Sequence, residues 1–167
     1  MILLAFIFLL FKVLALQEGD QKPSAQDIFS PFNGNWRGVF KVFSIAGKLQ
    51  DEIQVEQRYW WKHNEQQAVF SERKKDGAII RSKARNYSQD GKLFCEVINE
   101  ERGKTIHEGH FENGLLFWHR QLPDQNLTES FKERVVKTPA GREYQIDGVG
   151  IYGSVILIFE GRYQEVK

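Results

Sequence analysis

The sequence predicts an all-β protein, a single up-and-down antiparallel β-barrel of about 8–10 strands. After residue 34 the chain runs in segments of about ten residues, in which apolar and polar side chains alternate between clusters of turn residues. Three pairs, Asp76-Gly77, Asp90-Gly91 and Asn113-Gly114, are typical of type I′ hairpin turns, which need a positive φ at both central residues. No later segment repeats with the helical period, so helices should be few.

Length and composition indicate one domain without a disulfide framework. The chain has 167 residues, with 23 Lys+Arg against 22 Asp+Glu and a formal net charge of +1. This balance gives no basic footprint for nucleic acid, so no nucleic-acid partner is expected. A single cysteine, Cys95, excludes an intrachain disulfide and a cysteine-based zinc site.

The first residues are typical of an export signal. The apolar run Met1–Phe11 is shorter than the about 20 residues that span a bilayer, so no stable membrane span is expected. We predict a signal peptide over 1–16, with a possible cut after Ala15, although Lys12 follows the apolar run instead of preceding it. An uncleaved anchor or a buried segment is the alternative. The expected location is outside the cytoplasm, secreted or periplasmic.

A polar linker is expected over residues 17–31, with a short helical turn at Asp27-Ile28-Phe29. The barrel domain then covers residues 32–167, and a monomer is expected. Asn86-Tyr87-Ser88 and Asn126-Leu127-Thr128 are weak glycosylation acceptors, meaningful only in a host that glycosylates secreted proteins.

Alternation along each strand predicts which side chains face inward, because successive side chains of a strand point to opposite faces. In the first strand Trp36 faces in with Phe40, and in the second Tyr59 faces in while Trp60 lies outside. The other inward sets follow the same rule: Gly38 and Val42; Ile53, Val55, Gln57 and Trp61; Ala78, Ile80, Ser82 and Ala84; Leu93, Cys95 and Val97; Val155, Leu157, Phe159, Gly161 and Tyr163.

Small and polar residues on the inward face, opposite large rings, indicate an internal cavity. Simple filling of the barrel taper by alternating small and large residues is the alternative. The residues expected to line a cavity are Phe40, Val42, Val55, Gln57, Tyr59, Ser82, Ala84, Val97, Phe117, His119, Tyr144 and Phe159.

Gly34-Asn35-Trp36 followed by a strand and a run of hairpins resembles the G-x-W motif of the lipocalin and wider calycin superfamily. The resemblance implies that Trp36 closes one end of the barrel against an Arg of the last strand, here Arg162, with Gly34 at the start of the closure. It also implies a small, mainly apolar ligand inside. The Thr-Asp-Tyr-type loop, the usual disulfide and a helix after the last strand are missing, and ten strands resemble fatty-acid-binding proteins more than an eight-stranded lipocalin.

The histidines offer one interior candidate. His107 and His110 lie on opposite faces of a strand and cannot share a metal without a bulge. His119 lies inside if Phe117 also does, and would then be an interior polar anchor or a haem ligand. If Leu116 and Trp118 point inward instead, His119 lies outside, and the sequence does not decide between these alternatives. No metal site and no cofactor are expected.

Other reactive side chains give no catalytic constellation. Glu129 and Glu133 share a strand face, which we expect to be an outer face beside Lys and Arg, with an interior polar patch as the alternative. Cys95 is expected to be inert packing. No nucleophile elbow or phosphate-binding glycine loop appears, so no catalytic residue is expected.

The leading hypothesis is an exported barrel that holds a small apolar ligand. The alternatives are an isomerase or lyase of a lipid or pigment on the same barrel, a haem-binding calycin, and a filled barrel that uses Trp60 as a contact surface. A cavity lined by apolar groups favours the binding protein, paired ionisable groups with shifted pKa values favour the enzyme, and a filled interior favours the contact domain.

Overall fold

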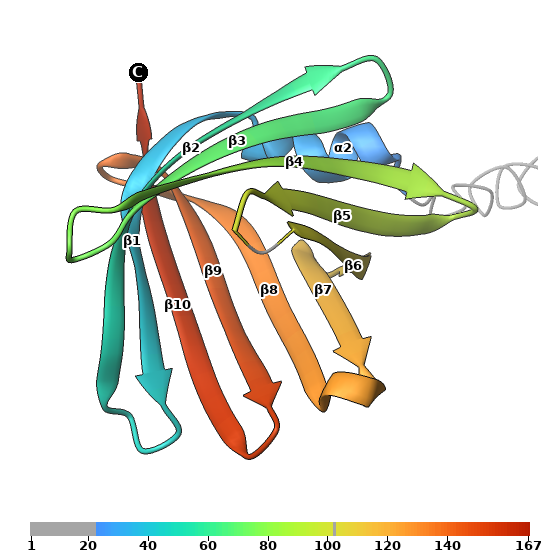
Figure 1. The fold of residues 1–167 in the computed structure, drawn as a ribbon. Coiled ribbons are helices and arrows are strands. Elements are labelled where there is room, and N and C mark those ends of the chain that lie inside the picture. The colour runs from blue at the N-terminus through green and yellow to red at the C-terminus, as the bar shows by residue number, and fades with distance from the viewer. Residues whose placement is uncertain (1–22, 102) are drawn as a thin grey trace, which may run out of the picture.

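The chain folds into one closed antiparallel β-barrel, with a short helical segment at one end (Figure 1). The computed structural model describes residues 23–101 and 103–167. The strands follow the order of the sequence around the barrel, and the last strand pairs with the first. The predicted all-β, up-and-down barrel is therefore confirmed, with ten strands. The predicted signal peptide, residues 1–16, lies outside the described residues.

Every strand pairs antiparallel with its neighbours in the chain, and β1 closes the barrel on β10, from Asn35 opposite Val166 to Ser44 opposite Leu157. The strands are β1 Gly34–Ser44, β2 Leu49–Lys62, β3 Glu65–Arg73, β4 Ile79–Gln89, β5 Lys92–Asn99, β6 Gly103–Glu112, β7 Leu115–Leu122, β8 Leu127–Thr138, β9 Gly141–Tyr152 and β10 Val155–Val166.

Two of the three predicted turns have the expected backbone. Both residues of Asp90-Gly91 and both residues of Asn113-Gly114 have positive φ, as a type I′ turn requires. At Asp76-Gly77 only Gly77 has positive φ, at +87°, within a longer connection in which the Asp76 carboxylate accepts a hydrogen bond from the Ala78 amide. Here the loop is longer than two residues, so one glycine is sufficient.

The helical segment consists of α2, Ala25–Phe29, and the 3₁₀ turn η1, Ser30–Phe32. Ser24 and Asp27 form a reciprocal capping box at the start of α2. Ile28, Phe29 and Phe32 are buried in the core of the barrel. The last seven residues of the segment expected as a linker, residues 25–31, thus belong to helical turns that pack on the barrel, against β3, β4 and β8. We call residues 25–32 the plug.

Trp36 seals the junction between the plug and β1. Its side chain is 1% exposed, and its indole N–H donates a 2.8 Å hydrogen bond to the Phe32 carbonyl. The cation that covers the indole is Arg142 of β9, whose Cζ lies 5.0 Å from the ring centroid. The guanidinium also donates to the Pro31 carbonyl and pairs with Glu165 at 2.8 Å.

The structure corrects the expected Trp36–Arg162 pair. Arg162 lies on the outer face, where it pairs with Asp147 at 2.7 Å and Glu160 at 3.1 Å. The reason is the pleat of β10, which turns Tyr163 inward and therefore Arg162 outward. Gly34 does begin the closing strand, with a φ of +139°.

Meander topology gives the barrel two different ends. The β1–β2, β3–β4, β5–β6, β7–β8 and β9–β10 connections lie at one end, which we call the hairpin end. The remaining connections, the start of β1 and the plug lie at the other, plugged end. No helix among the described residues is long and apolar enough to cross a membrane.

Removal of the Trp36 side chain tests this closure. We expect Trp36→Ala to lower the free energy of unfolding by about 3–5 kcal/mol, the usual cost of a large cavity in a core. The matched control is Trp60→Ala, because Trp60 lies on the outer face under Arg58 and should cost much less. Urea denaturation measures both, and equal losses for the two variants would contradict the assigned role of Trp36.

Candidate functional site

The interior of the barrel holds a partly open cavity of about 280 Å³, with lining residues from all ten strands. Apolar and aromatic side chains make up most of its wall, with a few polar groups among them. The lining residues are Phe40, Ile53, Val55, Gln57, Tyr59, Phe70, Glu72, Ser82, Cys95, Val97, His107, Trp118, Phe131, Glu133, Tyr144, Ile146 and Tyr163.

Most of the residues expected in the lining lie on the inner face. Those that contact the cavity are Phe40, Val55, Gln57, Tyr59, Ser82, Val97 and Tyr144. Phe159 and Ala84 are buried beside it, and Phe159 stacks between Phe40 and Phe131 at centroid distances of 5.7 and 5.6 Å. Val42 shares the inner face of β1 with Phe40 by alternation but does not contact the cavity.

Phe117 and His119 lie on the outer face, unlike the expectation that placed both in the lining. Phe117 stacks on His110 at 4.8 Å, and His119 Nδ1 lies 3.0 Å from the Ser130 hydroxyl. His119 is therefore neither an interior anchor nor placed to ligate a haem inside the barrel. Leu116 and Trp118, the other alternative, occupy the inner face and are almost fully buried.

A glycine on the neighbouring strand explains this orientation of β7. Gly109 lies opposite Trp118, and a Cβ atom added at Gly109 would come within 2.4 Å of the indole ring. The missing side chain makes room for the indole on the inner face. The pairing of a glycine with a tryptophan across the Asn113-Gly114 hairpin was the sequence signal that could have decided between the two alternatives.

A chain of polar groups crosses the cavity near the plugged end. The Tyr59 hydroxyl lies 3.5 Å from Gln57 Oε1 and 3.4 Å from the Tyr144 hydroxyl. Tyr144 in turn hydrogen-bonds to the Glu133 carboxyl, which also receives a hydrogen bond from Trp118. We call Gln57, Tyr59, Tyr144 and Glu133 the polar floor.

Glu133 corrects the expected outer face for the acidic pair. The carboxyl lies in the cavity wall on β8, and burial raises its pKa to about 7, against the lowering effect of the hydrogen bonds from Tyr144 and Trp118. The group therefore changes its charge near neutral pH. Burial also raises the pKa of the nearby Cys95 thiol, which keeps its proton, consistent with inert packing.

Glu129 also faces inward and holds a separate polar cluster nearer the hairpin end. His107 Nε2 lies 3.1 Å from the carboxylate, the Tyr152 hydroxyl donates at 2.6 Å, and Arg120 pairs with it at 3.5 Å. Burial raises the pKa of Glu129, but the hydrogen bonds from His107 and Tyr152 and the charge of Arg120 bring it below its ordinary value. A carboxylate has no proton to donate, so His107 must carry its proton on Nε2.

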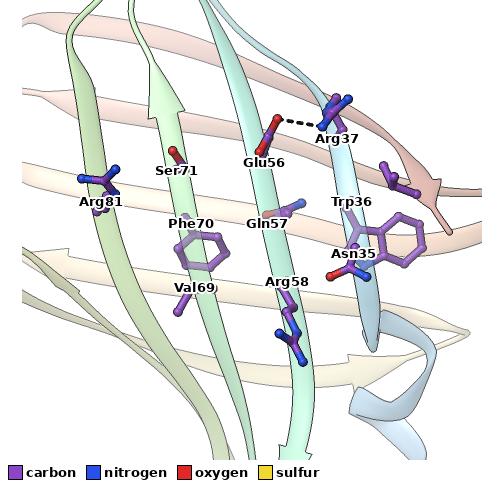
Figure 2. Close-up of a pocket in the computed structure, with 11 residues that line it drawn as sticks. Asn35, Trp36, Arg37, Glu56, Gln57, Arg58, Val69, Phe70, Ser71 and Arg81 are labelled. Carbon is purple, nitrogen blue, oxygen red and sulfur yellow. Dashed lines mark ion pairs between the residues drawn. The ribbon is translucent and has the colours of Figure 1, made fainter.

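A second hollow, of about 320 Å³, lies on the outer wall across β10 and β1 to β4. Figure 2 shows the residues of β1 to β4 that line it. Its outward-facing side chains include Arg37, Arg58 and Arg81, and Arg37 pairs with Glu56 at 3.0 Å. Both partners of this ion pair are more than half exposed, and such pairs contribute little to stability or binding. The interior cavity is therefore the better candidate site.

The groups in the cavity suit binding better than metal chemistry. Among the described residues no three His, Cys, Asp or Glu side chains gather closely enough to hold a metal ion. Sequence reasoning missed the polar lining residues Glu72, His107 and Glu133. It also missed the apolar ones Phe70, Phe131 and Ile146. It placed the acidic pair of β8 outside because charged side chains on a strand usually face solvent.

No family model and no curated protein matches the chain. Among solved structures the barrel is similar to Rv2717c from M. tuberculosis, with a TM-score of 0.56 and 11% identity over 87% of this chain and 99% of that chain. A redesigned β-barrel, b11L5F_LGL, matches with a TM-score of 0.47, also at 11% identity over 87% of this chain and 100% of that chain. A protein of unknown function of the DUF3598 family from Nostoc punctiforme has a TM-score of 0.27 and 9% identity over the same shares. The first similarity shows a shared barrel fold, and the resemblance to lipocalins stays a prediction.

The titration of Glu133 has a consequence for stability. Between its ordinary pKa of 4.5 and about 7 the folded chain holds a proton that the unfolded chain releases, so the free energy of unfolding falls as pH rises through this window. We expect Glu133→Gln to lose this part of the pH dependence and to exceed the parent protein in stability by on the order of 2 kcal/mol at about pH 8.

Chemical denaturation across the pH range measures this difference. Glu108→Gln is the matched control, because Glu108 lies outside and pairs with Lys92. Parallel stability curves for the parent and Glu133→Gln would show that Glu133 does not titrate near neutral pH in the folded state.

Proposed function

We propose that this protein binds a small, mainly apolar molecule inside its barrel. The observation that supports it is the cavity of about 280 Å³, surrounded by ten strands and lined chiefly by aromatic and aliphatic side chains. Its size lies near the lower end of small-molecule pockets, which are about 300–1,000 Å³. The polar floor and the Glu129 cluster add a few fixed polar groups, as is usual in such pockets.

Apolar side chains exposed at the hairpin end support uptake from that side. Ile45 and Leu49 flank the β1–β2 turn, Ile98 lies at the end of β5, and Val155 begins β10, and each is at least 42% exposed. All four lie at the hairpin end, opposite the plug. Apolar groups that gather on one end of a soluble surface commonly mark a place of contact with an apolar partner.

Export is part of the proposal. It rests on the apolar N-terminal residues 1–16, and the single Cys95 is compatible with an oxidising compartment. Of the two glycosylation acceptors, Asn86 is buried and donates to Gln66 at 2.9 Å, whereas Asn126 is exposed. Glycosylation of the folded chain would therefore be confined to Asn126.

An enzyme on the same barrel is the second candidate, favoured by the His107–Glu129 pair and by the raised pKa of Glu133. Catalysis of an isomerase or lyase type needs such groups to converge on one reacting atom. Here Glu133 hydrogen-bonds to Tyr144 and Trp118, while His107 hydrogen-bonds to Glu129. The two groups belong to separate networks, so binding ranks first.

Filling the cavity tests the proposal. We expect the neutral fluorophore N-phenyl-naphthylamine to bind the purified protein, and Val97→Phe to weaken this binding at least about tenfold, because the added ring occupies the cavity. Fluorescence titration measures both affinities. Native mass spectrometry of the protein from its own host would identify a resident ligand.

Ile98→Phe is the control, because Ile98 follows Val97 on the outer face and is 51% exposed. It should leave the affinity for the fluorophore unchanged. Absence of fluorophore binding, or equal binding by Val97→Phe and the parent, would contradict a binding cavity inside the barrel.

A further inference from the structure

Gln57 brings an unpaired hydrogen-bond donor into the cavity. It is 6% exposed, and among the described residues its Nε2 has no hydrogen-bond partner. The other end of the amide, Oε1, faces the Tyr59 hydroxyl at 3.5 Å. Buried polar groups in native proteins are nearly always paired, so an unpaired donor that lines a cavity indicates a missing acceptor.

The charges around the cavity limit what that acceptor can be. Within the part of the chain that the structure describes, the lining contains the carboxyls of Glu72 and Glu133, one histidine, and no Lys or Arg. Arg120, on the inner face nearby, is already paired with Glu129. A ligand carboxylate that reached the polar floor would lose its hydration without gaining a cation, and it would meet Glu133.

We propose that the cavity selects an uncharged, mainly apolar molecule that carries a hydroxyl or carbonyl oxygen, and that Gln57 Nε2 donates a hydrogen bond to this oxygen. This inference rests on the proposed binding function and names the chemical class of its ligand. The apolar part of the molecule lies against Phe40, Phe131 and Val97, and its oxygen lies at the polar floor.

The other groups of the floor accommodate a neutral oxygen. The hydroxyls of Tyr59 and Tyr144 can rotate to donate or to accept, so they serve either a carbonyl or a hydroxyl. Because burial raises the pKa of Glu133 to about 7, its protonated form adds a second donor at and below neutral pH. An ammonium group has no lone pair for Gln57, so an amine leaves the buried donor unpaired.

A displacement series tests the ligand class. The fluorophore N-phenyl-naphthylamine is bound to the purified protein at neutral pH and displaced by four molecules of similar length: decanol, methyl octyl ketone, decanoate and decylamine. We expect decanol and the ketone to displace it at concentrations at least about tenfold lower than decanoate, which would bury a charge without a cation beside it. We expect the same advantage over decylamine, which could pair with Glu133 only by taking two charges out of water and would leave Gln57 Nε2 without an acceptor.

Two variants test whether the polar floor causes the preference for neutral ligands. Gln57→Leu should weaken decanol about fivefold to tenfold more than it weakens the fluorophore, the usual effect of one neutral hydrogen bond. Urea denaturation of the variant shows separately whether it has folded. Glu133→Gln should narrow the difference between decanol and decanoate, because it removes the carboxylate that repels the acid.

Gln54→Leu is the matched control, because Gln54 lies on the exposed face of β2 and should change none of these affinities. Displacement by decanoate or decylamine at concentrations as low as those of decanol would overturn the ligand class while the binding function stands. Equal effects of Gln57→Leu on decanol and on the fluorophore would overturn the role of Gln57. Failure of the fluorophore to bind the parent would instead contradict the binding function itself.

Discussion

The hydrogen bond from the Trp36 indole to the Phe32 carbonyl is the contact on which the closed end of this barrel depends. A helical segment leaves its last carbonyls without partners in the segment itself, and they need donors from elsewhere. Trp36 of β1 donates to Phe32, Gln66 of β3 donates to the Phe29 carbonyl at 2.7 Å, and Arg142 of β9 donates to the carbonyl of Pro31. Three strands that are distant in sequence thus hold one short plug.

Close contacts between aromatic rings and glycines on neighbouring strands determine how much of the barrel interior stays empty. A Cβ atom at Gly148 would lie 2.4 Å from the Phe131 ring, and one at Gly109 would lie at the same distance from the Trp118 ring. Both rings therefore occupy the space that a side chain on the neighbouring strand would otherwise fill. Because interiors pack densely, a cavity persists only where side chains are directed away from it in this manner.

Local sequence chemistry predicted the fold better than the site. A two-residue turn such as Asn113-Gly114 defines a hairpin without reference to the rest of the chain, so the strand number was accessible. Where both sides of a strand carry apolar residues, alternation alone does not determine which side faces the barrel interior, and contacts with other strands do. On β7 the close approach of Trp118 to Gly109 determines it. Arg142 was missed because the resemblance assigned the cation over Trp36 to the last strand, and Glu133 was missed because charged side chains were expected on the outer face.

The polar floor combines two unfavourable features, whereas the other buried side-chain atom without a hydrogen-bond partner among the described residues, Asn86 Oδ1, lies outside the cavity lining. Gln57 keeps a buried donor unpaired, and Glu133 accepts a burial that raises its pKa. Either feature alone would only lower the stability of the fold, and an apolar residue at that position would remove the loss. Gln57 on β2 and Glu133 on β8 are linked through Tyr59 and Tyr144, and both line the same cavity although their strands are not neighbours in the barrel. Unpaired or buried polar groups of this kind cluster at binding sites, because a bound ligand supplies the hydrogen-bond partners that the empty barrel lacks.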